Sequence, residues 1–423
     1  MIEREGKKWT PVPGAKAALK SLFFNKFLRE IDRLARHFHG DLNLHKEMRR
    51  RIVLWRGVTW GGRKGAQLSL CPIAGERLDA LPSIANARDL ESCATGGAPR
   101  REMMTGTTPK KTTPTHVSKK EFEELFRAVC NWGRWGNDDE RGTLNYIQPE
   151  HIRRGAGLVR SGRSVSMAVP INQVAGPDNP RPATHYMVRG FDIHSDRGEP
   201  QFSADYFASE FHGDCHTHLD ALCHIAFQGK LYNGKPMSAV TSRGPTIQDI
   251  TAYAHGIVGR GVLLDIPRLR GVKWLEPGEA VTKAELEAAE KEEGVRLSEG
   301  DIFVFRTGHH RRRLELGPWN NGYDGEGKAG LHVETILMLH DRKVAAFFPD
   351  GDGETVPSNV EGVACPIHAL QIASMGMACA DSLQFEELVK VCEEERRWEF
   401  LVVAAPLRLP GGTGSLFNPL AIF

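Results

Sequence analysis

The segment at residues 212–224, HGDCHTHLDALCH, holds four of the chain's seventeen histidines and two aspartates. Imidazole and carboxylate groups are costly to bury without partners, at about 2–7 kcal/mol for each polar group and more for a charge. The same groups are common ligands of divalent metal ions such as Zn²⁺ and Mn²⁺. The segment therefore predicts a metal site, because a bound ion would offset the cost of burying these side chains.

The spacing of these residues predicts how they are presented. In an extended strand alternate side chains share one face, and here that face would carry His212, Asp214, His216, His218 and Asp220. The four-residue step from Asp220 to His224 fits a first helical turn, which would return the last imidazole to the carboxylate. Structural zinc usually binds cysteine thiolates, whereas a His/Asp set leaves positions open for water and substrate. A catalytic site is favoured over the alternative of a surface loop or of hydrogen-bonded core histidines.

The elements that must position this segment alternate between strand and helix patterns. β-Branched and aromatic runs predict strands at residues 165–169, 203–212, 257–266, 301–307, 344–348 and 400–405. Helices are predicted from a capping box of Thr282 with Glu285, after Pro366, and over residues 385–392. This mixture predicts an α/β domain of mixed α+β type.

The charge distribution predicts a division of the chain. Residues 1–118 contain 22 Lys and Arg against 11 Asp and Glu, whereas the remaining residues contain 33 against 42. An amphipathic basic helix is expected within residues 22–40, and residues 92–118 are rich in Thr, Gly, Pro and Lys, which is typical of a linker. We therefore expect a partly helical basic extension at 1–91, a linker at 92–118 and the main domain at 119–423.

Several classes of protein do not fit the sequence. No apolar run approaches the roughly 18–20 residues of a membrane span, and the first residues lack the apolar core of a secretory signal. The eight cysteines form no CxxC pair and are interpreted as reduced thiols, so a cytoplasmic protein is expected. No nucleic-acid motif accompanies the basic segment, and no nucleic-acid partner is expected.

The segment also resembles a known signature. His218, Asp220 and His224 resemble the pattern HxGTHxDxPxH of the cyclase family of metal-dependent hydrolases, which includes bacterial kynurenine formamidase and isatin hydrolase. Further stretches resemble that family in the same order along the chain: WGNDDERGTLNYI, LVRSGRSVSM, RGVLLDI, DIFVFRTG, PIHAL and the C-terminal FLVVAAPLRLPGGTGSLFNPLAIF. The resemblance covers residues 119–423 and implies a swivelling β/β/α fold.

The resemblance implies roles for individual residues. Asp214 stands where the family has its first metal-ligating histidine, and His216 stands where it has glycine. His218 and Asp220 are implied as metal ligands and His224 as the catalytic residue for proton transfer. Either Asp214 or His216 would supply the remaining ligand, and an aspartate there shifts the preference towards Mn²⁺.

Two further positions concern a second ion. Family members with two metals add a later histidine and a glutamate, and His368 and Asp381 stand at these positions here. The resemblance thus implies one divalent ion, Mn²⁺ or Zn²⁺, with a second ion as an additional prediction that uses His368 and Asp381 as ligands.

The resemblance finally implies a reaction. We expect hydrolysis of an N-formyl or cyclic amide bond in a small, aromatic substrate by metal-activated water. Two alternatives stay open: a metal-dependent cyclase or dehydratase, and a non-catalytic metal- or ligand-binding protein. Family members commonly form dimers or tetramers, so a homo-oligomer is also expected.

Overall fold

The computed structural model describes residues 2–5, 8–11, 116–192 and 198–423. Contacts divide the chain into two units, Met1–Arg100 and Arg101–Phe423. Strands β1 (Ile2–Glu5) and β2 (Lys8–Pro11) form an antiparallel hairpin in the first unit. The basic helix expected within residues 22–40 lies outside the described residues, as does the linker up to residue 115. The division into these three segments therefore stays a prediction.

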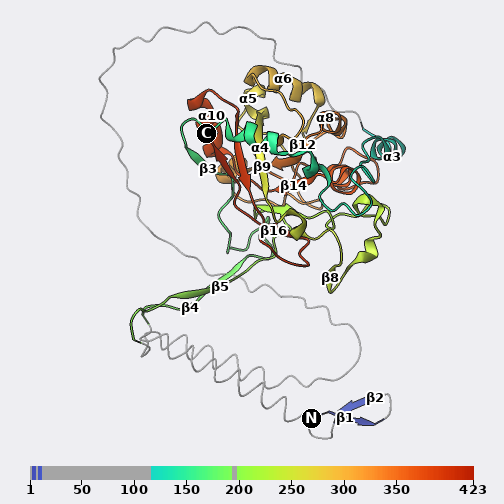
Figure 1. The fold of residues 1–423 in the computed structure, drawn as a ribbon, viewed down its shortest axis with the longest axis vertical. Coiled ribbons are helices and arrows are strands. Elements are labelled where there is room, and N and C mark those ends of the chain that lie inside the picture. Colours follow the sequence, from blue (N-terminus) through green and yellow to red (C-terminus); the bar gives the residue numbers. More distant parts are fainter. Residues whose placement is uncertain (1, 6–7, 12–115, 193–197) are drawn as a thin grey trace, which may run out of the picture. The chain divides into compact units, whose positions relative to one another are not determined.

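The second unit is built on a nine-stranded sheet (Figure 1). Its strands, in sheet order, are β16 (Gly414–Leu416), β6 (His218–Asp220), β14 (Ala378–Asp381), β13 (Ala346–Pro349), β11 (Ile302–Arg306), β9 (Ile257–Asp265), β15 (Glu399–Ala404), β17 (Leu420–Ile422) and β3 (Ser164–Ser166). The four central strands β14, β13, β11 and β9 run parallel. The strands on both flanks pair antiparallel.

The sequences of the central strands explain their position. Every residue of β11 (IFVFR) and of β13 (AFFP) is buried, which is the continuous apolar pattern of a parallel strand covered on both faces. The strands predicted at 257–266, 301–307, 344–348 and 400–405 correspond to β9, β11, β13 and β15. These four predictions are confirmed.

Helices surround the sheet. They are α3 (Lys119–Ala128), α4 (Pro149–Ala156), α5 (Ile266–Arg270), α6 (Lys283–Glu293), α7 (His309–Leu316), α8 (Thr335–Asp341), α9 (Pro366–His368), the π-helix η5 (Ala369–Met375) and α10 (Glu386–Glu395). Helices α4 and α6 contact β9. The predicted capping box of Thr282 and Glu285 is present at the start of α6, which ends at Gly294 in a left-handed conformation.

Shorter elements complete the described part. Four 3-10 turns are η1 (Gly142–Tyr146), η2 (Tyr232–Gly234), η3 (Met237–Ala239) and η4 (Ile250–Tyr253). Three two-stranded pairs join β4 (Thr184–Arg189) to β5 (Ala204–Ala208), β7 (Val240–Thr241) to β8 (Gly244–Pro245), and β10 (Ala280–Val281) to β12 (Gly330–Leu331). Among the described residues no helix is both long and apolar enough to span a bilayer. The mixed α/β class predicted for the main domain is confirmed.

Candidate metal centre

The short strand β6 lies between β16 and β14 and positions the first two predicted ligands. In the antiparallel pair with β14, His218 is directly opposite Asp381, and opposed residues share one face of a sheet. Nε2 of His218 is 3.6 Å from Oδ1 of Asp220 and 3.6 Å from Oδ2 of Asp381. These three residues bring their ligand atoms within 4.8 Å of one another, so they could hold a metal ion.

Asp220 provides the test of whether a metal fits. Its side chain is 1% exposed, and neither carboxylate oxygen has a hydrogen-bond partner in the described part of the chain. Nδ1 of His212 lies 3.1 Å from Oδ1 but is not aligned for a hydrogen bond. Burial alone would raise the pKa of Asp220, yet the imidazoles of His224, His212 and His218 hold it well below its usual range. An ionised, buried carboxylate with both oxygens unused fits a bound cation.

His218 is oriented as a ligand by its own backbone neighbourhood. Its Nδ1 is 2.8 Å from the carbonyl oxygen of His216. Donation from Nδ1 to this carbonyl fixes the tautomer and leaves the Nε2 lone pair directed at the two aspartates. The neighbouring Thr217 hydroxyl donates to the carbonyl of Ser382 at 2.6 Å and accepts from the amide of Val169 at 2.9 Å. These bonds anchor the start of β6.

His368 enters the same cluster from helix α9. Its Nδ1 is 2.9 Å from Oε1 of Glu354, and its backbone amide donates to the same oxygen at 2.8 Å. Its Nε2 is 3.3 Å from Oδ2 of Asp381 and 3.9 Å from Oδ2 of Asp220. Burial alone would lower the pKa of His368, but Asp381 and Glu354 raise it well above its usual value. A carboxylate that holds the outer nitrogen of a metal-binding histidine is the usual supporting arrangement.

His224 reaches the cluster through a turn, in which its amide donates to the carbonyl of Ala221 at 2.9 Å. Its ring stacks on that of His212, with the ring centroids 3.8 Å apart and the planes 2° from parallel. Burial lowers the pKa of His224 to about 4, although the Asp220 carboxylate opposes this shift. The imidazole is therefore unprotonated at neutral pH and available to accept a proton.

The prediction of one extended strand over residues 212–220 is wrong. The backbone is bent over residues 212–216 and is a strand only from His218 to Asp220. Two predicted ligands in the bent segment contact other residues. Oδ1 of Asp214 is 2.6 Å from Nζ of Lys328, and Nε2 of His216 is 3.1 Å from the carbonyl oxygen of Asn172. Neither residue belongs to the metal-holding groups found among the described residues, and their role as ligands stays an untested prediction.

Sequence reasoning missed several contributors. His212 was placed on the ligand face but was not assigned a role, and it forms a candidate group with Asp220 and His224. Cys379 forms another with His368 and Asp381. Glu354 was not considered at all. Glu354 ends the stretch DGDGE, which follows the strand predicted at residues 344–348. Acidic side chains at alternate positions after a buried strand indicate a site at the end of that strand.

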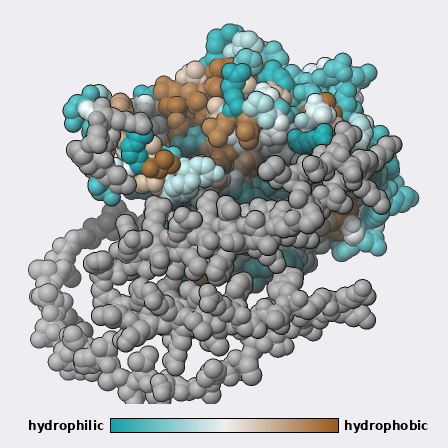
Figure 2. All heavy atoms as spheres, turned by 90° about the horizontal axis from the view of Figure 1, so that it is seen from below, coloured by the Kyte–Doolittle hydropathy of each residue, from teal (hydrophilic) through white to brown (hydrophobic). Residues whose placement is uncertain are grey.

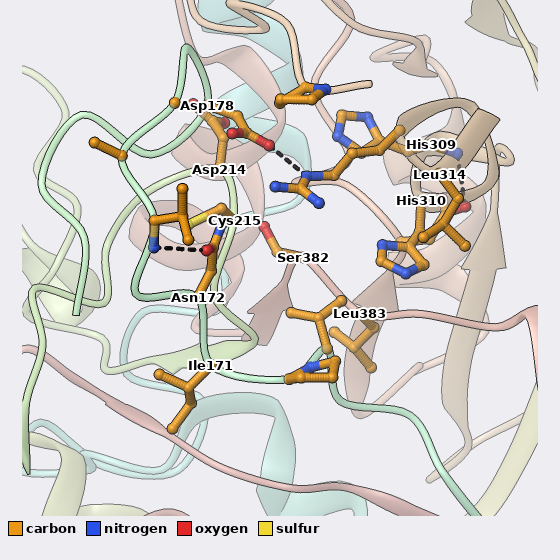
Figure 3. A pocket seen from close by; sticks show the side chains of 18 residues that line it. Ile171, Asn172, Asp178, Asp214, Cys215, His309, His310, Leu314, Ser382 and Leu383 are labelled. Carbon is orange, nitrogen blue, oxygen red and sulfur yellow. Dashed lines mark hydrogen bonds and ion pairs between the residues drawn. The ribbon is translucent and has the colours of Figure 1, made fainter. Parts of the chain in front are cut away.

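A cavity of about 460 Å³ adjoins the cluster (Figure 3). Its lining includes Asp214 and Cys215 from the bent segment, Ser382 next to the predicted ligand Asp381, and His309 and Arg313 from helix α7. His218, Asp220 and Asp381 are not among its described lining residues. The guanidinium of Arg313 donates to the carboxylate of Asp178, which also lines this cavity. Mostly apolar walls with a few polar groups are typical of a small-molecule site.

The chain is similar to known proteins. The cyclase family model matches residues 164–351. A solved structure described as a novel cyclase is 33% identical, with a TM-score of 0.63, over 70% of this chain and 99% of that one. Isatin hydrolase A from Ralstonia solanacearum is 20% identical, with a TM-score of 0.46, over 61% of this chain and 91% of that one. Isatin hydrolase A from Labrenzia aggregata is 20% identical, with a TM-score of 0.45, over 63% and 94% of the two chains. No curated protein matches.

Proposed function

Because the chain belongs to the cyclase family, we propose that it is a metal-dependent hydrolase that cleaves an amide C–N bond. The proposed substrates are small, aromatic molecules with an N-formyl group or a cyclic amide. One observation carries the proposal: Asp220 is buried and ionised, and both of its oxygens lack a hydrogen-bond donor beside imidazoles and a second aspartate. A bound cation is the simplest partner for such a carboxylate.

The ligands proposed for one ion are His218, Asp220 and Asp381, with His368 as a fourth. Nitrogen and carboxylate oxygen ligands suit Zn²⁺ and Mn²⁺. A second ion would use the group of His368, Cys379 and Asp381. A divalent ion held by these residues would supply Lewis-acid chemistry, which polarises a scissile carbonyl and lowers the pKa of water from 15.7 towards about 7.

The proposed proton transfer uses a side chain of the protein, His224. His224 is unprotonated at neutral pH and is held parallel to His212 beside Asp220. We propose that its imidazole accepts a proton from the attacking water and delivers it to the leaving nitrogen, because amide cleavage needs a protonated leaving group. The cavity next to Asp381 and Asp214 would hold the apolar body of the substrate.

Metal removal tests this function. We expect a chelator to abolish hydrolysis of N-formylkynurenine and isatin, and Mn²⁺ or Zn²⁺ to restore it, with release of a titratable acid as the readout. Acid release also separates hydrolysis from ring closure or dehydration, which yields none. Full activity in metal-free protein would contradict the proposed mechanism, and a restored metal without turnover of either compound would contradict the proposed substrate class.

The redox state of the described cysteines is relevant to the cellular compartment of the protein. Cys130, Cys215, Cys223, Cys365, Cys379 and Cys392 are all free thiols. Free thiols are typical of reducing compartments, and we therefore propose a cytoplasmic location.

Assembly into homo-oligomers is proposed from the hairpin of β4 and β5, which extends from the sheet (Figure 1). Its rings Tyr186 and Tyr206 stack at 5.0 Å, yet both are exposed, as are Met187, Val188, Phe191, Phe202 and Phe207. An isolated two-stranded hairpin is marginal in water. Seven half-exposed large side chains offer on the order of 700 Å², close to the ~800 Å² that each partner contributes to a stable interface.

A second copy of the chain is the partner that we propose, since a two-fold axis pairs the same apolar surface of two copies. The face seen in Figure 2 also gathers hydrophobic residues in a patch with hydrophilic margins, as interaction surfaces do.

Charges on the hairpin should therefore separate the subunits. We expect the double variant Val188→Glu, Phe207→Glu to shift the protein from a dimer to a 46.9 kDa monomer in light scattering, because buried carboxylates without partners oppose association. The matched control is Leu407→Glu, which changes another exposed apolar residue and should stay dimeric. A monomeric wild type, or a dimeric double variant, would contradict the proposed interface.

A further inference from the structure

The cavity beside the metal centre lies at one edge of the sheet. Strands β11, β13 and β14 run parallel, so their carboxyl ends meet at the same edge. Asp350 and Ser382 directly follow β13 and β14 and line the cavity, and Asp381, a proposed metal ligand, is the last residue of β14. In open α/β sheets ligands bind outside the carboxyl ends of the strands. The cavity is therefore placed to hold the part of a substrate that extends away from the proposed ion.

Helix α7 contributes one of its faces to this cavity. The helix begins three residues after the end of β11, and both His309 and Arg313 line the cavity, because residues four apart share a helix face. Arg311 and Arg312 pair with glutamates instead and are not among the described residues that line the cavity. Arg313 is thus the one arginine or lysine of that described lining.

Asp178 holds the guanidinium of Arg313 by a single nitrogen. Its Oδ2 accepts from Nε of Arg313, and no other described residue bonds to the guanidinium. The hydrogens on Nη1 and Nη2 are therefore unused. The Asp178 side chain is 1% exposed and that of Arg313 is 26% exposed, so a molecule in the cavity would meet the guanidinium rather than its partner. The two free nitrogens form a fork that matches the two oxygens of a carboxylate.

The other titratable oxygen and nitrogen groups of the described lining do not compete for this role. Oδ1 of Asp214 accepts from Nζ of Lys328 at 2.6 Å. Both oxygens of Asp350 accept from backbone amides at the start of α7, at 2.7–2.9 Å. Burial lowers the pKa of His309 to about 3 and also lowers that of His310, so both imidazoles are uncharged at neutral pH. Arg313 therefore supplies the unused charged donors of the described lining.

We propose that Arg313 binds a carboxylate of the substrate, so that the preferred substrates are small aromatic amides with an acid group apart from the scissile bond. This inference rests on the proposed function and specifies its substrate class. Apolar side chains such as Ile171 and Leu383 line the same cavity and would contact the aromatic body. Asp178 is then a positioning residue, because it fixes the guanidinium through Nε.

Binding of two matched probes to the full chain tests this inference without turnover. Indole-3-acetate and indole-3-acetamide differ only in the replacement of a carboxylate by a carboxamide, and isothermal titration calorimetry gives the Kd of each. We expect the wild type to bind the acid at least about 10-fold more tightly than the amide, because hydrogen bonds between charged groups are the stronger ones. Arg313→Met should weaken binding of the acid alone and remove this preference. The control Arg311→Met, at an arginine of the same helix that pairs with Glu315, should keep it.

Equal Kd values in the wild type, or no binding of the acid, would overturn the inference. An unchanged preference in Arg313→Met would also overturn it, since the acid would then bind elsewhere, for example at the metal. If Arg313→Met does not fold because Asp178 is left buried without a partner, the double variant Arg313→Met, Asp178→Asn removes both charges and should lose the same preference. Failure of the proposed function has a different signature, which is full activity without metal or no amide hydrolysis with metal, whatever the two Kd values.

Discussion

Replacement of Asp220 by alanine is expected to remove the bound metal and to lower kcat/KM by about 1,000-fold or more. Asp220 belongs to two of the three candidate ligand groups and is within 4 Å of His212, His218 and His368. A Lewis-acid ion stabilises transition-state charge by several kcal/mol, and about 1.36 kcal/mol corresponds to a tenfold change in rate. Elemental analysis and steady-state hydrolysis measure the two losses.

The thermal stability of the same variant distinguishes a metal ligand from a residue with a purely structural role. A ligand that binds only the folded state raises its stability, so a bound ion would stabilise the wild type through Asp220, whereas the alanine variant would have no ion to lose. We therefore expect a chelator to lower the Tm of the wild type and to leave the Tm of Asp220→Ala unchanged. The control Asp341→Ala removes an exposed aspartate and should change neither metal nor Tm. A variant that retains metal and full activity would refute the ligand assignment.

Replacement of His224 by alanine should give a different pattern, with metal retained and kcat lowered by about 10²–10⁴-fold, the usual contribution of a general acid–base group. The reason is geometric. His224 stacks on His212 beside Asp220, but it is absent from the group of His218, Asp220 and Asp381 that we propose as the ligands of the ion.

The wild-type pH profile adds a second test of His224. Its lowered pKa, about 4, leaves the imidazole unprotonated from neutral pH down to that value. The imidazole becomes protonated, and stops acting as a base, only as the pH falls through this pKa. Activity should therefore fall on the acid side of the profile as the pH approaches about 4. The control His255→Ala, at an exposed histidine, should match the wild type. Equal kcat in His224→Ala and the control would contradict the proton-transfer role.

Local patterns predicted much of the fold because they are set by nearby residues. The apolar run of β11 fixes a buried strand whatever surrounds it, and the Thr282–Glu285 capping box forms between residues three apart. The alternation of His218 and Asp220 holds because β6 spans both residues. The predicted roles of His368 and Asp381 rest on family resemblance, and the structure brings Asp381 to both His218 and His368.

Contacts between distant segments could not be predicted. Lys328 is 114 residues from Asp214 in the chain, and nothing in either segment indicates that pair. Residues 212–216 form a bend in place of the predicted strand, because the antiparallel pairing of β6 with β14 and β16 begins only at His218. Strand alternation applies only where a partner strand fixes the pleat.

The most direct measurement of the central claim is anomalous diffraction from crystals grown with Mn²⁺ or Zn²⁺. The account predicts a strong peak about 2.0–2.2 Å from Nε2 of His218 and from an oxygen of Asp220, with Asp381 or His368 as a further ligand. An anomalous map with no peak at this position, or with the His218 and Asp220 side chains turned away from a shared ion, would contradict it.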